Sequence, residues 1–112
     1  MSGRPSAALL ASALIRRVHD EGGFATVCAK GDPDGGALLL LALDRAGAVR
    51  VFERGVGPTG APAPIDSTPR DASAGAVEVY WRRRRENDPD LWVIELDIPD
   101  AERFAAEILG QH

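Results

Sequence analysis

Residues 32–43 read Asp-Pro-Asp-Gly-Gly-Ala-Leu-Leu-Leu-Leu-Ala-Leu, a rigid polar turn followed at once by an aliphatic run. Proline fixes φ, aspartates bond to nearby backbone amides and glycines accept positive φ, so the first half of this stretch predicts a chain reversal. The run over 37–43 is too short for a comfortable helix and predicts a central strand buried on both faces. Asp-Pro-Asp occurs again at 88–90, before a second apolar run.

Periodicity on either side of these turns predicts the remaining elements. Leu10, Leu14 and Val18 recur at helical spacing after the capping residue Ser6, and Gly22 provides a stop. The same criteria predict helices over 7–21, 73–86 and 98–109, and strands over 24–29, 37–43, 48–54 and 91–96.

The element order is therefore α-β-β-β-α-β-α, which predicts an α+β fold. We expect a mainly antiparallel four-stranded sheet with helices packed on one face, and the first three strands in an antiparallel meander. The segment 55–70 is rich in proline and glycine and carries no periodicity, so we expect a mobile loop there.

The 112 residues, with 45% hydrophobic and 27% charged content, fit a single domain over 1–112. A net charge of −4 argues against sequence-independent binding of nucleic acid and against an acidic membrane surface. No apolar stretch approaches the ~18 residues needed to span a bilayer. Cys28 is the single cysteine, so no intramolecular disulfide can form, and we expect a reducing, cytoplasmic compartment.

Four carboxylates on two turns are the strongest candidates for chemistry. Asp32, Asp34, Asp88 and Asp90 are residue types that bind hard cations such as magnesium or calcium. If the last strand followed the third one by a parallel crossover, the two turns would lie roughly 17–20 Å apart, at opposite ends of the sheet. The long segment before the second helix allows the other arrangement. The favoured interpretation is two structural turns, and a shared metal or acid/base site is the alternative.

Arginines beside an aromatic residue form the second candidate site. Arg82 to Arg85 follow Trp81, and such residues can hold phosphates or stack on bases. Successive helical positions point about 100° apart, so the four cannot form one compact face. We take Arg82, Arg85, Trp81 and Trp92 as candidates for contact with a protein partner, against the alternative of a solvated helix end and core aromatics.

The remaining reactive residues suggest no catalytic arrangement. His19 falls late in the first helix and His112 ends the chain, so neither a histidine pair nor a catalytic triad is indicated. Cys28 is expected to be a small core residue rather than a nucleophile. The segment 31–36 lacks the spacing of glycine-rich phosphate loops. The sequence predicts no catalytic residue and no cofactor.

Several motifs together resemble a known family. These are Leu14-Ile15-Arg16-Arg17, Gly22-Gly23-Phe24-Ala25, the segment 31–37 and the segment 88–95. Over roughly residues 9 to 97 the chain resembles a small bacterial family catalogued as domain of unknown function 1491. The resemblance implies no activity, cofactor or catalytic residue that could be carried over.

Two functions of different classes remain. The first, which we favour, is a small cytoplasmic interaction or accessory module without chemistry of its own, as a homodimer or with another protein partner. The second is a metal-assisted hydrolase or phosphate-binding enzyme that uses the two Asp-Pro-Asp turns and an arginine.

Overall fold

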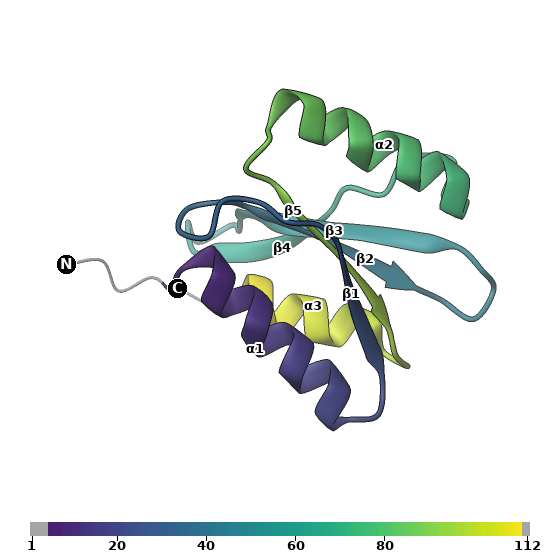
Figure 1. The fold of residues 1–112 in the computed structure, drawn as a ribbon, viewed down its shortest axis with the longest axis horizontal. Helices are drawn as coiled ribbons and strands as arrows, with labels where there is room; N and C mark the ends of the chain where they lie inside the picture. Colours follow the sequence, from purple (N-terminus) through teal and green to yellow (C-terminus); the bar gives the residue numbers. More distant parts are fainter. Residues whose placement is uncertain (1–4, 111–112) are drawn as a thin grey trace.

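The computed structural model describes residues 5–110, which form one five-stranded sheet with helices on both faces (Figure 1). The elements are α1 (Ala7–Asp20), β1 (Phe24–Ala29), β2 (Leu38–Leu43), β3 (Val49–Val56), β4 (Pro62–Asp66), α2 (Ala74–Asn87), β5 (Trp92–Asp97) and α3 (Ala101–Leu109). The α+β class and the predicted order of the elements are confirmed, with β4 as an additional strand.

The strand order is β1-β5-β2-β3-β4, so β5 lies between β1 and β2. β5 runs antiparallel to β1 and parallel to β2, and the remaining pairs are antiparallel. The predicted meander of the first three strands is therefore wrong for β1, which does not pair with β2. The connection between β1 and β2 must instead pass over the beginning of β5.

Helix packing on both faces corrects the prediction that all helices share one face. Leucines of β2 alternate between two apolar cores, with Leu38 and Leu40 on the side of α1 and α3, and Leu39 and Leu41 on the side of α2. Alternation of this kind follows from the two-residue period of a strand. A central strand buried on both sides therefore separates two cores, as the aliphatic run over 37–43 predicted.

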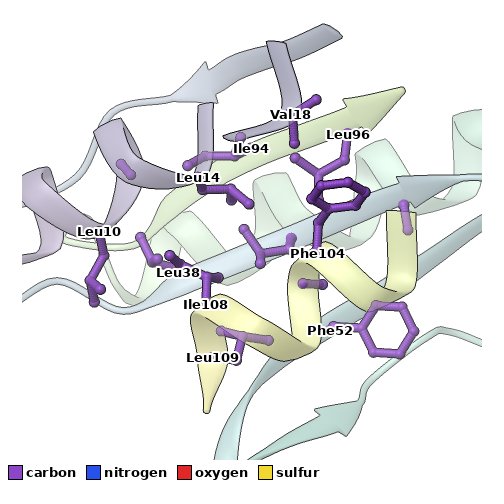
Figure 2. Packing of buried hydrophobic residues seen from close by; sticks show 14 of the residues in the cluster. Leu10, Leu14, Val18, Leu38, Phe52, Ile94, Leu96, Phe104, Ile108 and Leu109 are labelled. Atoms are coloured by element: carbon purple, nitrogen blue, oxygen red, sulfur yellow. The ribbon is translucent and has the colours of Figure 1, made fainter. Parts of the chain in front are cut away.

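The larger core lies between the sheet and the pair α1 and α3. Leu10, Leu14 and Val18 of α1 face the sheet beside Phe104 of α3, as Figure 2 shows. The thinner core below α2 contains two buried residues of that helix, Val77 and Trp81. The pairing of the strands determines which loops meet at each end of the sheet, and candidate sites could form at these ends.

Two helices begin after a capping serine, and the start of the third differs from the prediction. The hydroxyl groups of Ser6 and Ser73 accept hydrogen bonds from the N–H groups of Leu9 and Ala76. The last helix begins at Ala101 rather than at 98, because Asp100 adopts a left-handed conformation with φ of 59°. Pro99 therefore lies before the helix and not in its first turn.

The segment 55–70, which was predicted to be a loop, contains the end of β3 and the whole of β4. Gly57 donates its N–H to Ala61 across a tight turn, and Gly60 has a φ of +82°. Gly55 lies under Ile65, since a Cβ atom at position 55 would be 2.6 Å from the Ile65 side chain. Prolines at Pro62 and Pro64 masked this strand in the sequence, because proline usually excludes a central strand.

Within residues 5–110, none of the helices has the length and apolar character needed to cross a membrane.

Candidate functional site

The two Asp-Pro-Asp turns lie against each other. The N–H of Asp32 donates to the carbonyl oxygen of Asp90 at 3.0 Å, and the indole Nε1 of Trp92 donates to the carbonyl oxygen of Asp32 at 2.8 Å. Because β5 is parallel to β2, both turns precede strands that start at the same end of the sheet. The alternative geometry that the sequence left open is the one that the chain adopts.

Glycines allow the first turn to cross the second. A Cβ atom at Gly31 would lie 2.0 Å from the carbonyl oxygen of Asp90, and one at Gly36 would lie 2.2 Å from it. Such distances exclude any side chain at these two positions without a shift of the backbone. The crossing also supports the start of α1, whose residues Ala7 and Ala8 donate their N–H groups to the carbonyls of Asp34 and Pro33.

Two of the four candidate carboxylates hold the backbone of their own turns. Asp32 Oδ2 accepts from the N–H of Gly35 at 2.8 Å, and Asp88 Oδ1 accepts from the N–H of Asp90 at 3.2 Å. Among residues 5–110, no group of three or more His, Cys, Asp or Glu side chains is placed to hold a metal ion. The structure thus joins the turns through their backbones, and a catalytic or metal role for the four aspartates remains a prediction.

Arg85 ties the second turn to the end of β1. Its Nε donates to the carbonyl of Leu91, and its Nη2 donates to the carbonyls of Pro89 and Lys30. A planar guanidinium presents several donors in a fixed geometry, which suits a position between three carbonyl groups. This arginine, a candidate for partner contact, is used for folding.

The other three contact candidates differ in accessibility. Trp81 and Trp92 are 7% and 5% exposed and lie in the cores on opposite faces of the sheet. Arg82 has a side chain that is 63% exposed, paired with Glu78 and placed 4.7 Å from the Trp81 ring. Only Arg82 of this set is available at the surface.

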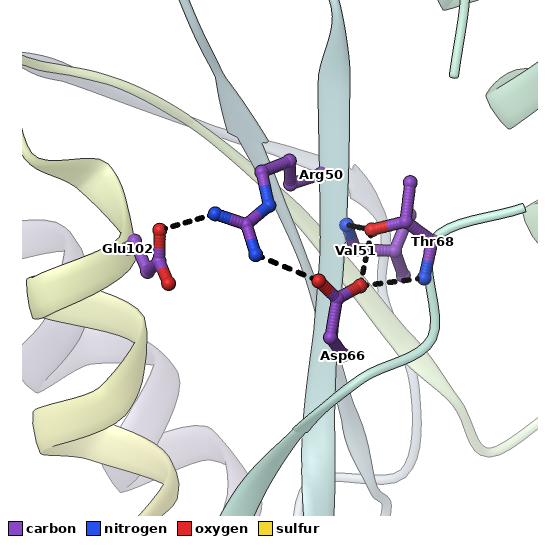
Figure 3. Close-up of polar contacts among 5 residues, drawn as sticks. All are labelled: Arg50, Val51, Asp66, Thr68 and Glu102. Carbon is purple, nitrogen blue, oxygen red and sulfur yellow. Dashed lines mark hydrogen bonds and ion pairs between the residues drawn. The ribbon is translucent and has the colours of Figure 1, made fainter.

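Two charged networks that sequence analysis missed connect the sheet to its helices. Arg84 of α2 binds both carboxylate oxygens of Glu53 at 2.9 Å, and its hydrogen bonds lower the pKa of Glu53. Arg50 lies between Asp66 and Glu102, as Figure 3 shows. Both Arg50 and Glu53 fall in the strand predicted over 48–54, but nothing in the sequence indicated their partners.

Asp66 has the most strongly shifted carboxyl group of the second network. Thr68 donates to Asp66 Oδ1 from both its hydroxyl and its N–H, and Arg50 donates to the other oxygen (Figure 3). Bonds from the Thr68 hydroxyl and from Arg50 lower the pKa of Asp66 to about 2. Favourable bonds to the ionised form explain this direction. The network joins β3, β4 and α3.

A cavity of about 900 Å³ lies where β2 and β5 end, next to the start of α3. Ligands of open α/β sheets often bind beyond the carboxyl ends of parallel strands. Here, however, both basic and acidic residues line the cavity: Arg45, Arg50 and Arg103, and Asp44, Asp97, Asp100 and Glu102. Asp44 already accepts from the N–H groups of Ala46 and Ala48, and Arg50 is bound to Glu102. This lining favours no charge class of ligand.

The unpaired side of β1, Phe24–Ala29, is the feature that sequence analysis did not single out; we call it the β1 edge. Phe24 is 70% exposed and Val27 is 40% exposed. Cys28 is also exposed, which corrects the expectation that it is a core residue, and partial burial raises the pKa of its thiol. His19 of α1 accepts the N–H of Ala25 at 3.3 Å. The uncharged composition of the strand was visible in the sequence, but its position at the edge was not.

Comparison with known proteins places the chain in a family. The sequence model described as "Protein of unknown function (DUF1491)" matches residues 6–106, and this range includes both turns and β1. The chain belongs to this family. No curated protein matches the chain. His112, the second histidine of the sequence, lies outside the described residues.

Solved structures of similar proteins, two of them described as DUF1491 family proteins, show the same fold. The crystal structure of a family protein from Caulobacter crescentus CB15 is 34% identical, covers 90% of this chain and 94% of its own, and superimposes with a TM-score of 0.81. An NMR structure of a DUF1491 protein from the same organism is 35% identical, with a TM-score of 0.75, and covers 89% and 91%. Protein Atu0922 from A. tumefaciens is 26% identical, with a TM-score of 0.70, and covers 85% and 86%. DUF1491 is a family of unknown function, and membership assigns no catalytic residue.

Proposed function

We propose that this DUF1491 protein is a non-catalytic interaction module that binds another polypeptide through the β1 edge. The observation that carries the proposal is an uncharged edge strand with Phe24 70% exposed and Val27 40% exposed. Strands at sheet edges present unpaired backbone groups that accept a further strand, and proteins that avoid such pairing place charges or prolines there.

Most side chains that could take part in catalysis make hydrogen bonds that stabilise the fold, which supports a binding role. Asp32 and Asp88 hold their own turns, and Arg84 and Arg85 bind Glu53 and three backbone carbonyls. Trp81 and Trp92, the residues that sequence analysis put forward for partner contact, are buried. A partner surface is therefore better sought on the β1 edge, with exposed Arg82 as a separate candidate.

The proposal also places the protein in the bacterial cytoplasm. The relatives with solved structures come from bacteria, and the chain contains a single free cysteine that is exposed to solvent. An exposed free thiol is compatible with a reducing compartment.

Site-specific photo-crosslinking in living cells tests the binding role. A photoreactive benzoylphenylalanine replaces Phe24 on β1, and the matched control replaces Val56, which is 77% exposed at the end of β3, next to the opposite edge of the sheet. We expect a discrete covalent adduct from position 24 and none from position 56. Equal adducts from both positions, or none from position 24, would contradict the proposal.

A further inference from the structure

Resting on the proposed function, we infer that the partner of the β1 edge is a second copy of this chain, paired antiparallel to it about a twofold axis near Thr26. The two sheets would then form one continuous sheet of ten strands, from five strands in each copy.

The two edges of the sheet differ in their ability to pair. In β4 the odd-numbered residues bond to β3, since Ser67 donates to Val51 and Gly57 donates to Ala61 on either side of the strand. Pro62 and Pro64 therefore occupy the outward positions, where they remove the N–H donors of that edge. Proline at such positions prevents further pairing. The sequence of β1, Phe-Ala-Thr-Val-Cys-Ala, contains neither proline nor charge.

The orientation of the β1 backbone fixes how a second strand can bind. The N–H of Ala25 is directed to His19 and not to β5, so Ala25 and Val27 present their backbone groups outward. A bulge between Val27 and Ala29 ends the regular part of the strand. An antiparallel copy that pairs Ala25 with Val27 of its partner, and Val27 with Ala25, uses both outward residues. His19 covers the first of these donors in the isolated chain and would yield it to the partner.

This register brings complementary side chains together. On the face shared with Glu95 and Asp97, Thr26 lies opposite Thr26 of the second copy, and Phe24 lies across from the bulge of that copy, which contains Cys28. Cross-strand contacts between side chains on one face stabilise a sheet. The interface thereby covers two exposed phenylalanines, one from each copy, which an unrelated extended peptide would not provide.

Charge at the two ends of β1 favours a second copy over other strands. Lys30 follows the strand, and the acidic pair Asp20 and Glu21 precedes it. In an antiparallel pair, the end of β1 that carries Lys30 lies at the end of the partner's β1 that follows Glu21, whose carboxylate also pairs with Arg17 of its own chain at 3.3 Å. Two such contacts arise by symmetry, one at each end of the paired strands. Opposite charges at the rim of an interface fix register and orientation.

The first experiment measures mass in solution under reducing conditions, by light scattering and sedimentation over a series of concentrations. The chain has a mass of 11.9 kDa, and we expect twice this value at the higher concentrations. Val27→Lys places two like charges near the axis and should give the monomer mass. The matched control Val56→Lys makes the same chemical change beside the opposite edge and should remain a dimer; circular dichroism confirms that both variants are folded.

The outcomes separate this inference from the proposed function. A monomeric wild-type chain at all concentrations, or a Val27→Lys variant that dimerises like wild type, would overturn the second copy as partner. If the chain is monomeric but position 24 crosslinks to a different protein, the β1 edge is still a binding site and only the identity of the partner is wrong. If position 24 yields no specific adduct at all, both proposals fail.

A second experiment reads the register through cysteine crosslinking. In the twofold arrangement, Phe24→Cys lies across from Cys28 of the partner, at the bulge that follows Val27. A pair of this kind that is not hydrogen-bonded has a Cα separation of about 4.5 Å in a regular strand, within the range of a disulfide. Within one strand, positions 24 and 28 are roughly 13 Å apart, too far for a bond. We expect a covalent dimer of Phe24→Cys in air, and none of wild type or Val56→Cys. A monomeric Phe24→Cys variant would overturn the pairing about Thr26.

Discussion

Arg85 joins carbonyl groups from the second Asp-Pro-Asp turn and from the end of β1, at Pro89, Leu91 and Lys30. Arg82 lies three residues earlier in the same helix but in a different environment, because its side chain is 63% exposed and bound to Glu78. Consecutive arginines of one helix thus have unequal energetic roles, which follow from the direction in which each side chain points.

Replacement of these two arginines should separate a structural role from a surface role. Arg85→Ala leaves three carbonyls without their charged donor, and we expect a loss of about 2 kcal/mol in the free energy of unfolding. Arg82→Ala should cost less than about 1 kcal/mol, since exposed ion pairs and cation–π contacts contribute little. Urea unfolding followed by circular dichroism measures both. Equal losses for the two variants would refute the structural role of Arg85.

Acid should weaken the junction of β3 and β4 through Asp66. Its pKa is lowered from 3.8 to about 2, mainly by the Thr68 hydroxyl and then by Arg50. Because the folded pKa lies below the unfolded one, the stabilisation is present above about pH 4 and disappears as the pH falls towards 2. We expect Asp66→Asn to reduce the dependence of unfolding free energy on pH within this window.

NMR titration of the carboxyl carbons tests the cause of this shift. The Asp66 signal of the wild type should titrate near 2, and in Thr68→Val it should titrate at a higher pH, because the hydroxyl donor is removed. A wild-type Asp66 signal that titrates near 3.8 would show that these bonds do not form in solution.

At the scale of elements, the connection between β1 and β2 has to step over the first residues of β5. Gly31 and Gly36 make this possible, because each lies where a Cβ atom would meet the carbonyl oxygen of Asp90. Gly35 belongs to the same turn, but a Cβ atom there would lie 3.7 Å from the nearest atom, Asp32 Oδ2, an ordinary contact. Gly31 and Gly36 are therefore required by the close approach of the Asp90 carbonyl group, whereas Gly35 is not.

A pair of alanine substitutions measures that constraint. Gly36→Ala should destabilise the fold by about 3 kcal/mol, since the added methyl group forces the crossing turns apart. Gly35→Ala should change the unfolding free energy by less than about 1 kcal/mol. Thermal and urea unfolding give both values. A Gly36→Ala variant as stable as Gly35→Ala would mean that the turns do not cross at the short distances described.

Local patterns in the sequence predicted where helices and strands occur, but they predicted less well which strands pair in the sheet. The capping residue Ser6 and the spacing of Leu10, Leu14 and Val18 placed α1, because helix signals depend on residues close in the chain. The pairing of β1 with β5 depends on residues about 70 positions apart, such as Phe24 and Asp97, and left no mark in either strand. β4 escaped notice because its prolines, at outward positions, resemble those of a loop.

The candidate site was predictable to the same limited extent. Repetition of Asp-Pro-Asp identified both turns and their role as strand starts, but not that they touch, since contact required the parallel pairing of β2 with β5. Trp81 and Trp92 were expected either in the core or at a partner surface. Their side chains are only 7% and 5% exposed, so both lie in the core. The β1 edge could not be identified before the strand order was known.

At the scale of the whole molecule, the sheet has an apolar core on each face, and the two Asp-Pro-Asp turns lie together at one end of the sheet. The carboxylates of Asp32 and Asp88 accept hydrogen bonds from backbone N–H groups of their own turns. A divalent cation would need several oxygen ligands at about 2.0–2.6 Å from one point, and would have to compete with these amides. We therefore expect the turns to stabilise the fold without metal.

Thermal unfolding in the presence of magnesium, manganese or calcium tests this expectation and the hydrolase alternative together. A cation that binds only the folded chain raises the melting temperature, by an amount that grows with the logarithm of its concentration above the dissociation constant. We expect no shift at millimolar concentrations of any of the three ions. The double variant Asp34→Asn and Asp90→Asn is the control, because it removes two of the four carboxylates and spares those that bond to turn amides. A rise in the wild type that the double variant lacks would establish a metal site at the joined turns and would favour the hydrolase over the interaction module.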